Sequence, residues 1–146
     1  MKQGLGRFEY YIIQLEDLLT KARGTENPAL YLYQNDVRTK LFMLEGLSKL
    51  YAGLHNKKRF TYAMEYFKSL EDLFGAIDHY EGIAKDFLKD DEMPSTLRMF
   101  AEEKKQQMLE NANLVLLKKK WTVPDLYRTK KIRSKIKSIT FFIVLD

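Results

Sequence analysis

Apolar residues recur at helical spacing through most of the chain. Between Leu5 and Arg23 they are mainly three or four positions apart, which places them on one face of a helix. Gly24 follows and Pro28 comes four residues later, and both residues favour the end of a helix. The first predicted element is therefore a helix over about residues 5–23.

Two longer stretches with the same periodicity follow. The pattern predicts a second helix from Pro28–Leu30 to about Leu50, ending before Gly53. It predicts a third and longest helix from about Lys57 to Leu88, with Asn56 as its N-cap.

The last third of the chain predicts two more helices. Ser95 is a good N-cap after the turn at Pro94, and an apolar stripe continues to about Lys119. Thr122-Val-Pro-Asp125 resembles a capping box with proline in the first turn, and predicts a fifth helix that runs into the C-terminus. Its apolar stripe has a spacing of four, three and four, at Ile132, Ile136, Ile139 and Ile143.

Four to five amphipathic helices with short connections predict an all-α fold, an antiparallel helical bundle. The 146 residues, 45% of them hydrophobic, fit a single domain over residues 1–146. The chain has no cysteine, which excludes a disulfide scaffold, a thiolate nucleophile and a cysteine-ligated metal centre.

The ends of the chain bear on location and assembly. Glu9, Glu16 and Asp17 interrupt what would be the apolar core of a signal peptide, and no window has the roughly 18 uninterrupted apolar residues of a membrane span. We therefore expect a soluble, cytoplasmic protein with no membrane partner. The apolar segment Ile139–Leu145 is expected to be buried, against the chain's own helices or, preferably, in a homodimer.

The net charge of +5 is concentrated in the last third of the chain. Residues 101–146 hold eleven basic and five acidic side chains, whereas residues 51–100 hold seven basic and nine acidic ones. Residues 118–137 alone carry nine basic side chains and one acid, Asp125. This asymmetry favours an anionic partner or a covering acidic surface.

Candidate binding residues follow from this charge. Lys130, Arg133 and Lys137 fall within about 60° of one another on a helix, which predicts the centre of an anion-binding surface. Lys135, together with Lys57, Lys58 and Arg59 at the start of the third helix, would contribute if the two segments meet in space. The alternative is a solubilising face, or a partner for the acidic stripe of Glu65, Asp72 and Asp86.

Signatures of catalysis are missing from the sequence. There is no G-x-S-x-G elbow, no phosphate-binding glycine loop, and no Glu-x-x-His or His-Glu-x-x-His spacing around the two histidines. The sequence therefore predicts a non-enzymatic protein without a metal ion or cofactor.

Three segments resemble the CHAD family, the conserved-histidine α-helical domain proteins associated with inorganic polyphosphate. Leu70-Glu-Asp-Leu-Phe-Gly-Ala-Ile-Asp-His79 is similar to its L-Q-D-L-L-G helix, and Lys130-Lys-Ile-Arg-Ser-Lys-Ile-Lys137 to its basic helix; Asn35-Asp-Val-Arg38 is a fainter likeness. Asn35 and Lys130 stand where the family has histidine, and the length fits one bundle. The resemblance implies a helical fold and phosphate contacts from Arg38, Arg133, Lys135 and Lys137.

Three functions stay open at this point. The favoured one is a polyanion-binding module with polyphosphate or another phosphate-rich ligand. The alternatives are a helical interaction protein that meets an acidic protein surface, and a non-specific nucleic-acid binder. Charge cannot separate polyphosphate from nucleic acid, because both offer phosphates. No base-reading motif is present, which favours the former.

Overall fold

The described part of the chain is helical throughout, apart from short connections. The computed structural model describes the backbone of residues 2–145 and the side chains of residues 6–136. Its helices are α1 (Lys2–Arg23), α2 (Pro28–Gln34), α3 (Val37–Leu54), α4 (Lys57–Lys89), α5 (Ser95–Lys118) and α6 (Tyr127–Leu145). The predicted all-α bundle is confirmed for these residues, with six helices instead of the predicted four to five.

The extra helix arises because the predicted second helix is broken, so its prediction as one continuous element was wrong. Asp36 adopts a left-handed conformation, with φ 56° and ψ 47°, between α2 and α3. Aspartate tolerates this region better than most residues, and its carboxylate here accepts a hydrogen bond from the Thr39 hydroxyl at 2.9 Å. The break lets α2 turn toward α5, where Asn113 accepts a hydrogen bond from the Ala29 amide and donates one to Asn27.

Two predicted helix starts also need correction. Ser95 is the first residue of α5 and not its cap, because Pro94 takes the cap position without a side-chain hydrogen bond. The segment 122–125 lies in the connection before α6. The Trp121 and Lys120 amides donate to the carbonyls of Leu116 and Leu117, which closes α5 and turns the chain back. Thr122 is buried in this turn and lies five residues before the start of α6, so it is not the cap of that helix.

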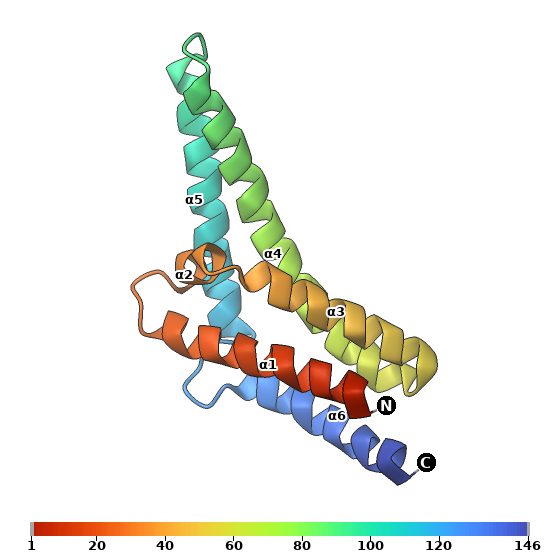
Figure 1. Ribbon diagram of the computed structural model, residues 1–146. Coiled ribbons are helices and arrows are strands. Elements are labelled where there is room, and N and C mark those ends of the chain that lie inside the picture. The colour runs from red at the N-terminus through yellow and green to blue at the C-terminus, as the bar shows by residue number, and fades with distance from the viewer. Residues whose placement is uncertain (1, 146) are drawn as a thin grey trace.

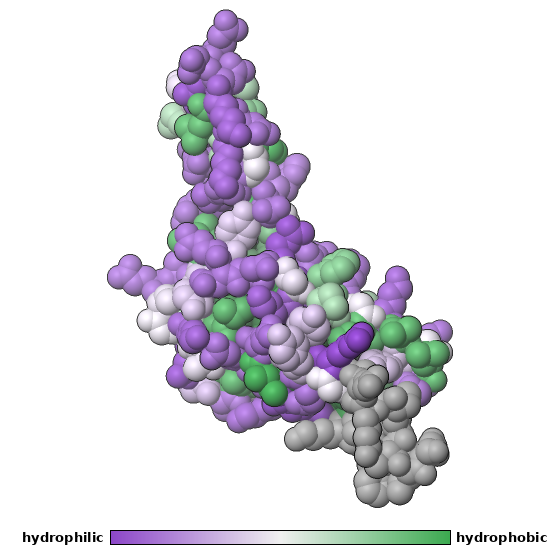
Figure 2. Space-filling model, viewed as in Figure 1, coloured by the Kyte–Doolittle hydropathy of each residue, from purple (hydrophilic) through white to green (hydrophobic). Residues whose placement is uncertain are grey.

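The longest helix is α4, as predicted, with 33 residues or about 50 Å. Figure 1 shows that the far ends of α4 and α5 project as a two-helix hairpin from a body that contains α1, α2, α3, α6 and the remainder of α4 and α5. On the face seen in Figure 2, this hairpin is mostly hydrophilic with small hydrophobic patches. The body therefore holds the main core.

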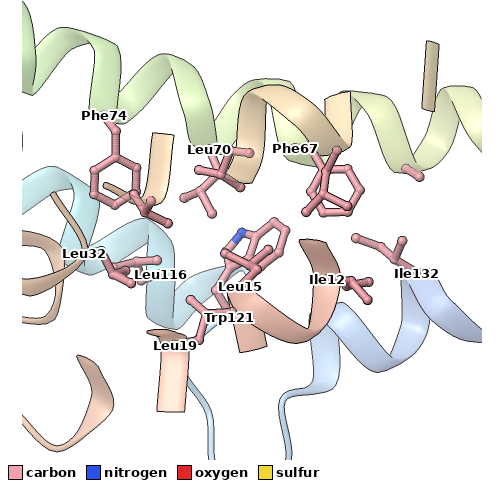
Figure 3. Close-up of a cluster of buried hydrophobic side chains, with 14 of the residues drawn as sticks. Ile12, Leu15, Leu19, Leu32, Phe67, Leu70, Phe74, Leu116, Trp121 and Ile132 are labelled. Carbon is pink, nitrogen blue, oxygen red and sulfur yellow. The ribbon is translucent and has the colours of Figure 1, made fainter. Parts of the chain in front are cut away.

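All six helices contribute buried side chains to the core, and Trp121 lies within it (Figure 3). The indole of Trp121 is 1% exposed and packs against Phe67, with ring centroids 6.2 Å apart. Ile12 and Ile132 bring α1 and α6 to the same cluster. Burial of these apolar surfaces fixes α6 between α1 and α4, which decides where its cations point.

Candidate functional site

Arg133 is held between two carboxylates of α1. Its guanidinium makes ion pairs with Glu9 at 3.1 Å and with Glu16 at 2.9 Å. Glu16 also accepts a hydrogen bond from the buried Thr129 hydroxyl at 2.8 Å. We call these four residues the α1–α6 clamp. Because two carboxylates match its charge, Arg133 joins helices here and does not stand at the centre of an open cationic row.

The other two members of the predicted row are Lys130 and Lys137. Lys130 is exposed, and no carboxylate among the described side chains forms an ion pair with it. The side chain of Lys137 lies outside the described residues, as do those of the apolar segment 139–145. The acids that meet this face of α6 belong to α1, whereas the predicted acidic stripe was on α4.

Arg38 has a similar surrounding of carboxylates. It pairs with Glu71 at 2.9 Å and with Asp78 at 3.0 Å, both on α4. Partial burial and a hydrogen bond from the Tyr33 hydroxyl to Asp78 raise the pKa of Tyr33 to about 12. Arg38 therefore lies in a hollow that already contains its counter-ions, and no lysine is among the described residues that line this hollow.

The other predicted cations do come together. Lys57, Lys58 and Arg59 at the start of α4 line one cleft of about 1010 Å³ with Lys135 of α6. We call this the basic cleft. Its remaining lining residues are Asn56, Thr61, Tyr62, Glu65 and Ser134. The two segments predicted to contribute jointly, separated by more than 70 residues of sequence, thus meet in space.

The geometry of the basic cleft is organised by a few contacts. The Asn56 side chain caps α4 by accepting from the Arg59 amide at 3.1 Å. The Arg59 guanidinium donates to the Lys135 carbonyl at 3.0 Å, which ties α4 to α6. The Lys135 ammonium lies 3.8 Å from the centroid of the Tyr62 ring. Among the described side chains, no carboxylate forms an ion pair with Lys57, Lys58 or Arg59.

The positive field at this point is stronger than a count of side chains suggests. The start of a helix carries a partial positive charge, so cations in the first turn of α4 are unfavourable for the helix itself. Glu65 is the single carboxylate that lines the basic cleft. An anion placed here would meet ammonium and guanidinium groups together with the first amides of α4.

Sequence reasoning missed the role of Arg128, which is not among the candidate binding residues predicted from the sequence. Its side chain is nearly buried, with the residue 9% exposed, and its guanidinium lies 4.1 Å from the centroid of the Tyr66 ring. It donates to the Lys119 carbonyl at 2.9 Å and to the Tyr62 hydroxyl at 3.2 Å. Burial raises the pKa of Tyr62, and the nearby Arg128 opposes that rise. Only the fold of the connection 119–126 reveals this placement.

Neither a metal-ligand cluster nor a membrane-spanning helix is found among the described residues. No group of three or more histidine, cysteine, aspartate or glutamate residues is arranged there to hold a metal ion. In the same part of the chain, no helix combines the length and apolar character that a membrane crossing requires.

Comparisons with known proteins leave the site to be judged on its geometry. No family model, curated protein or solved structure matches the chain.

Proposed function

We propose that the protein is a non-enzymatic module that binds phosphate-rich polyanions in the basic cleft, with inorganic polyphosphate as the ligand. One observation carries the proposal. Four cations from α4 and α6 line a single cleft, and no described carboxylate forms an ion pair with the three that belong to α4. The first-turn position of Lys57, Lys58 and Arg59 is unfavourable for the helix, and a bound anion would offset this cost.

A phosphate chain suits this cleft for electrostatic reasons. It presents closely spaced negative charges, so several cations can be engaged at once without any apolar contact. Arg59, oriented by its hydrogen bond to the Lys135 carbonyl, still has guanidinium hydrogens available for a phosphate oxygen. Each contact would release condensed counter-ions, so the affinity should fall steeply as salt rises.

The family resemblance adds only limited support. Of the three implied phosphate contacts whose side chains the structure describes, Lys135 lines the basic cleft. Arg38 and Arg133 are paired with carboxylates. We therefore rest the proposal on the cleft and keep the CHAD-like assignment as a hypothesis. A cytoplasmic location, and a homodimer formed through residues 139–145, also remain proposals.

A matched pair of double variants tests the function. Lys57→Glu with Lys58→Glu reverses two cations of the basic cleft. Lys85→Glu with Lys89→Glu makes the same charge change about 40 Å away near the other end of α4. Binding of polyphosphate, of single-stranded DNA and of double-stranded DNA is measured by competition across a salt series, with folding checked by circular dichroism.

The expected result is a polyphosphate affinity at least tenfold lower in the cleft variant at low salt, with little loss in the control. Equal losses in both variants would mean that net charge alone drives binding, and the cleft would have no special role. Tighter binding of double-stranded DNA than of polyphosphate would favour the nucleic-acid alternative. No binding of either ligand by the parent chain would favour an interaction protein.

A further inference from the structure

A second hollow adjoins the basic cleft and has a different chemistry. It encloses about 330 Å³ between α4 and the end of α5, which is at the lower limit of small-molecule sites. Its wall is formed largely by Tyr62, Tyr66, Leu70, Val115 and Trp121. Tyr62 and Glu65 line both spaces, so the two lie side by side. We call the second space the aromatic hollow.

The aromatic wall is held firmly in place. The Tyr62 and Tyr66 rings meet edge to face, with centroids 5.0 Å apart, and Tyr66 also meets Trp121 at 6.4 Å. Arg128 fixes both tyrosines from behind, through its stacking on Tyr66 and its hydrogen bond to the Tyr62 hydroxyl. A wall whose rings are already oriented loses little side-chain freedom when a flat group packs against it.

The guanidinium of Arg128, next to this aromatic wall, is a buried positive charge. Arg128 is about nine-tenths buried, and among the described side chains no carboxylate forms an ion pair with it. The described partners of this guanidinium are a carbonyl, a hydroxyl and the rings of Tyr66 and Tyr127, and none of them carries a full negative charge. Lys119 lines the hollow as a further cation. A ligand with both a flat apolar group and a negative charge would complement the aromatic wall and the nearby cations Arg128 and Lys119.

From this juxtaposition we propose that the ligand of the basic cleft is a nucleoside polyphosphate, with its base in the aromatic hollow and its phosphates among the cleft cations. The inference rests on the proposed function. Arg59 and Tyr66 are seven residues apart, about 10 Å along α4, a separation suited to a base joined to a short phosphate chain. Glu65 at the junction can accept a hydrogen bond from an amino group on the base.

The single tryptophan of the chain provides a direct probe, because Trp121 lines the hollow. Adenosine triphosphate and inorganic tripolyphosphate are compared by calorimetry and by Trp121 fluorescence at one ionic strength. Tripolyphosphate carries at least as much negative charge, so charge cannot explain a preference for the nucleotide. We expect the nucleotide to bind at least tenfold more tightly and to change the fluorescence of Trp121.

Two serine variants localise that preference. Ser69 is exposed and lines the hollow, so Ser69→Leu should fill it and bring the affinity ratio close to one while the tripolyphosphate affinity is kept. Ser95→Leu, at an exposed position in the projecting hairpin, should leave both affinities unchanged. A single-stranded oligonucleotide that displaces the nucleotide would support the same base and phosphate chemistry with nucleic acid as its source. Lack of displacement would assign the site to free nucleotides.

The failures are distinguishable. Equal affinities for the two triphosphates, or a preference that survives Ser69→Leu, would overturn the nucleotide inference and leave the basic cleft as a phosphate site. Binding of neither compound, or binding unaffected by Lys57→Glu with Lys58→Glu, would overturn both proposals.

Discussion

Helix α6 sends two cations in opposite directions, and they meet different surroundings. Arg133 and Lys135 are two residues apart, so their side chains leave the helix about 160° from each other. Arg133 enters the α1–α6 clamp, where Glu9 and Glu16 match its charge. Lys135 reaches the basic cleft, where three further cations line the same space. Two cations of one short segment thus have different surroundings: Arg133 joins two helices through ion pairs, and Lys135 lies in a cleft lined by other cations.

The largest expected effect breaks the clamp. Arg133→Met should lower the free energy of unfolding by about 2–3 kcal/mol, because it leaves the half-buried Glu16 without its cation. Lys131→Met, at an exposed position on the same helix, should change it by less than about 0.5 kcal/mol. Urea unfolding followed by circular dichroism measures both. Similar losses in the two variants would show that the clamp contributes no more than an ordinary surface charge.

The second prediction concerns the stability of the basic cleft and has the opposite sign. Lys57→Glu with Lys58→Glu replaces cations in the first turn of α4 by acids, which the helix dipole favours. We expect the free energy of unfolding to rise by about 0.5–1.5 kcal/mol in the absence of ligand. Lys85→Glu with Lys89→Glu, in the last turns of the same helix, should lower it. If the cleft variant is also destabilised, its cations serve the fold, and the contrast with the clamp disappears.

The contrast also explains how far the sequence could be read. Apolar periodicity predicted the bounds of α4 to within a residue, because a long helix buries one regular stripe. The break at Asp36 was not predicted because the apolar stripe continues through it. The break is stabilised by the packing of α2 against α5, which the local sequence does not show. Helical spacing predicted that Lys130, Arg133 and Lys137 share one face of α6. It could not tell which helix that face would meet, because the acids of α1 are more than 110 residues away in sequence.

The sequence predicted the members of the basic cleft, but only on the condition that the start of α4 and the α6 segment meet in space. Lys57, Lys58 and Arg59 were recognisable because cations are unfavourable where Asn56 starts a helix. Their meeting with Lys135 depends on how α6 packs, and the hydrogen bond from Arg59 to the Lys135 carbonyl has no sequence signature. The role of Arg128 was hidden for the same reason, since the connection that buries it has an irregular backbone.

A third matched ion pair extends the comparison to the projecting hairpin. The hydrogen bond and ion pair from Lys105 lower the pKa of Glu81 below its ordinary value of 4.5, in spite of partial burial. Its stabilising contribution is therefore present above pH 4.5 and is lost as the pH falls through the lowered pKa. Glu81→Gln should cost about 1 kcal/mol at pH 7 and much less at pH 3. Urea unfolding at both pH values measures this, with the exposed Glu102→Gln as a control that should show no such difference.

The smallest expected effect concerns the connection 119–126, which orients α6 toward the α1–α6 clamp and the basic cleft. Lys120 has φ 63° at the position after the end of α5, where glycine is the usual residue because a Cβ is unfavourable in this conformation. Its ammonium also lies 4.6 Å from the centroid of the Tyr127 ring, a contact that offsets part of the cost. Lys120→Ala loses the contact and keeps the Cβ, whereas Lys120→Gly loses both. The glycine variant should therefore be more stable than the alanine variant by about 0.5–1 kcal/mol, measured by urea unfolding.

Because the amides of Lys120 and Trp121 would still close α5, both variants should keep the polyphosphate affinity of the parent chain. A glycine variant that is stabilised but binds more weakly would mean that the cost at Lys120 helps to hold Lys135 in the basic cleft, and the two sides of α6 would then be coupled through this turn.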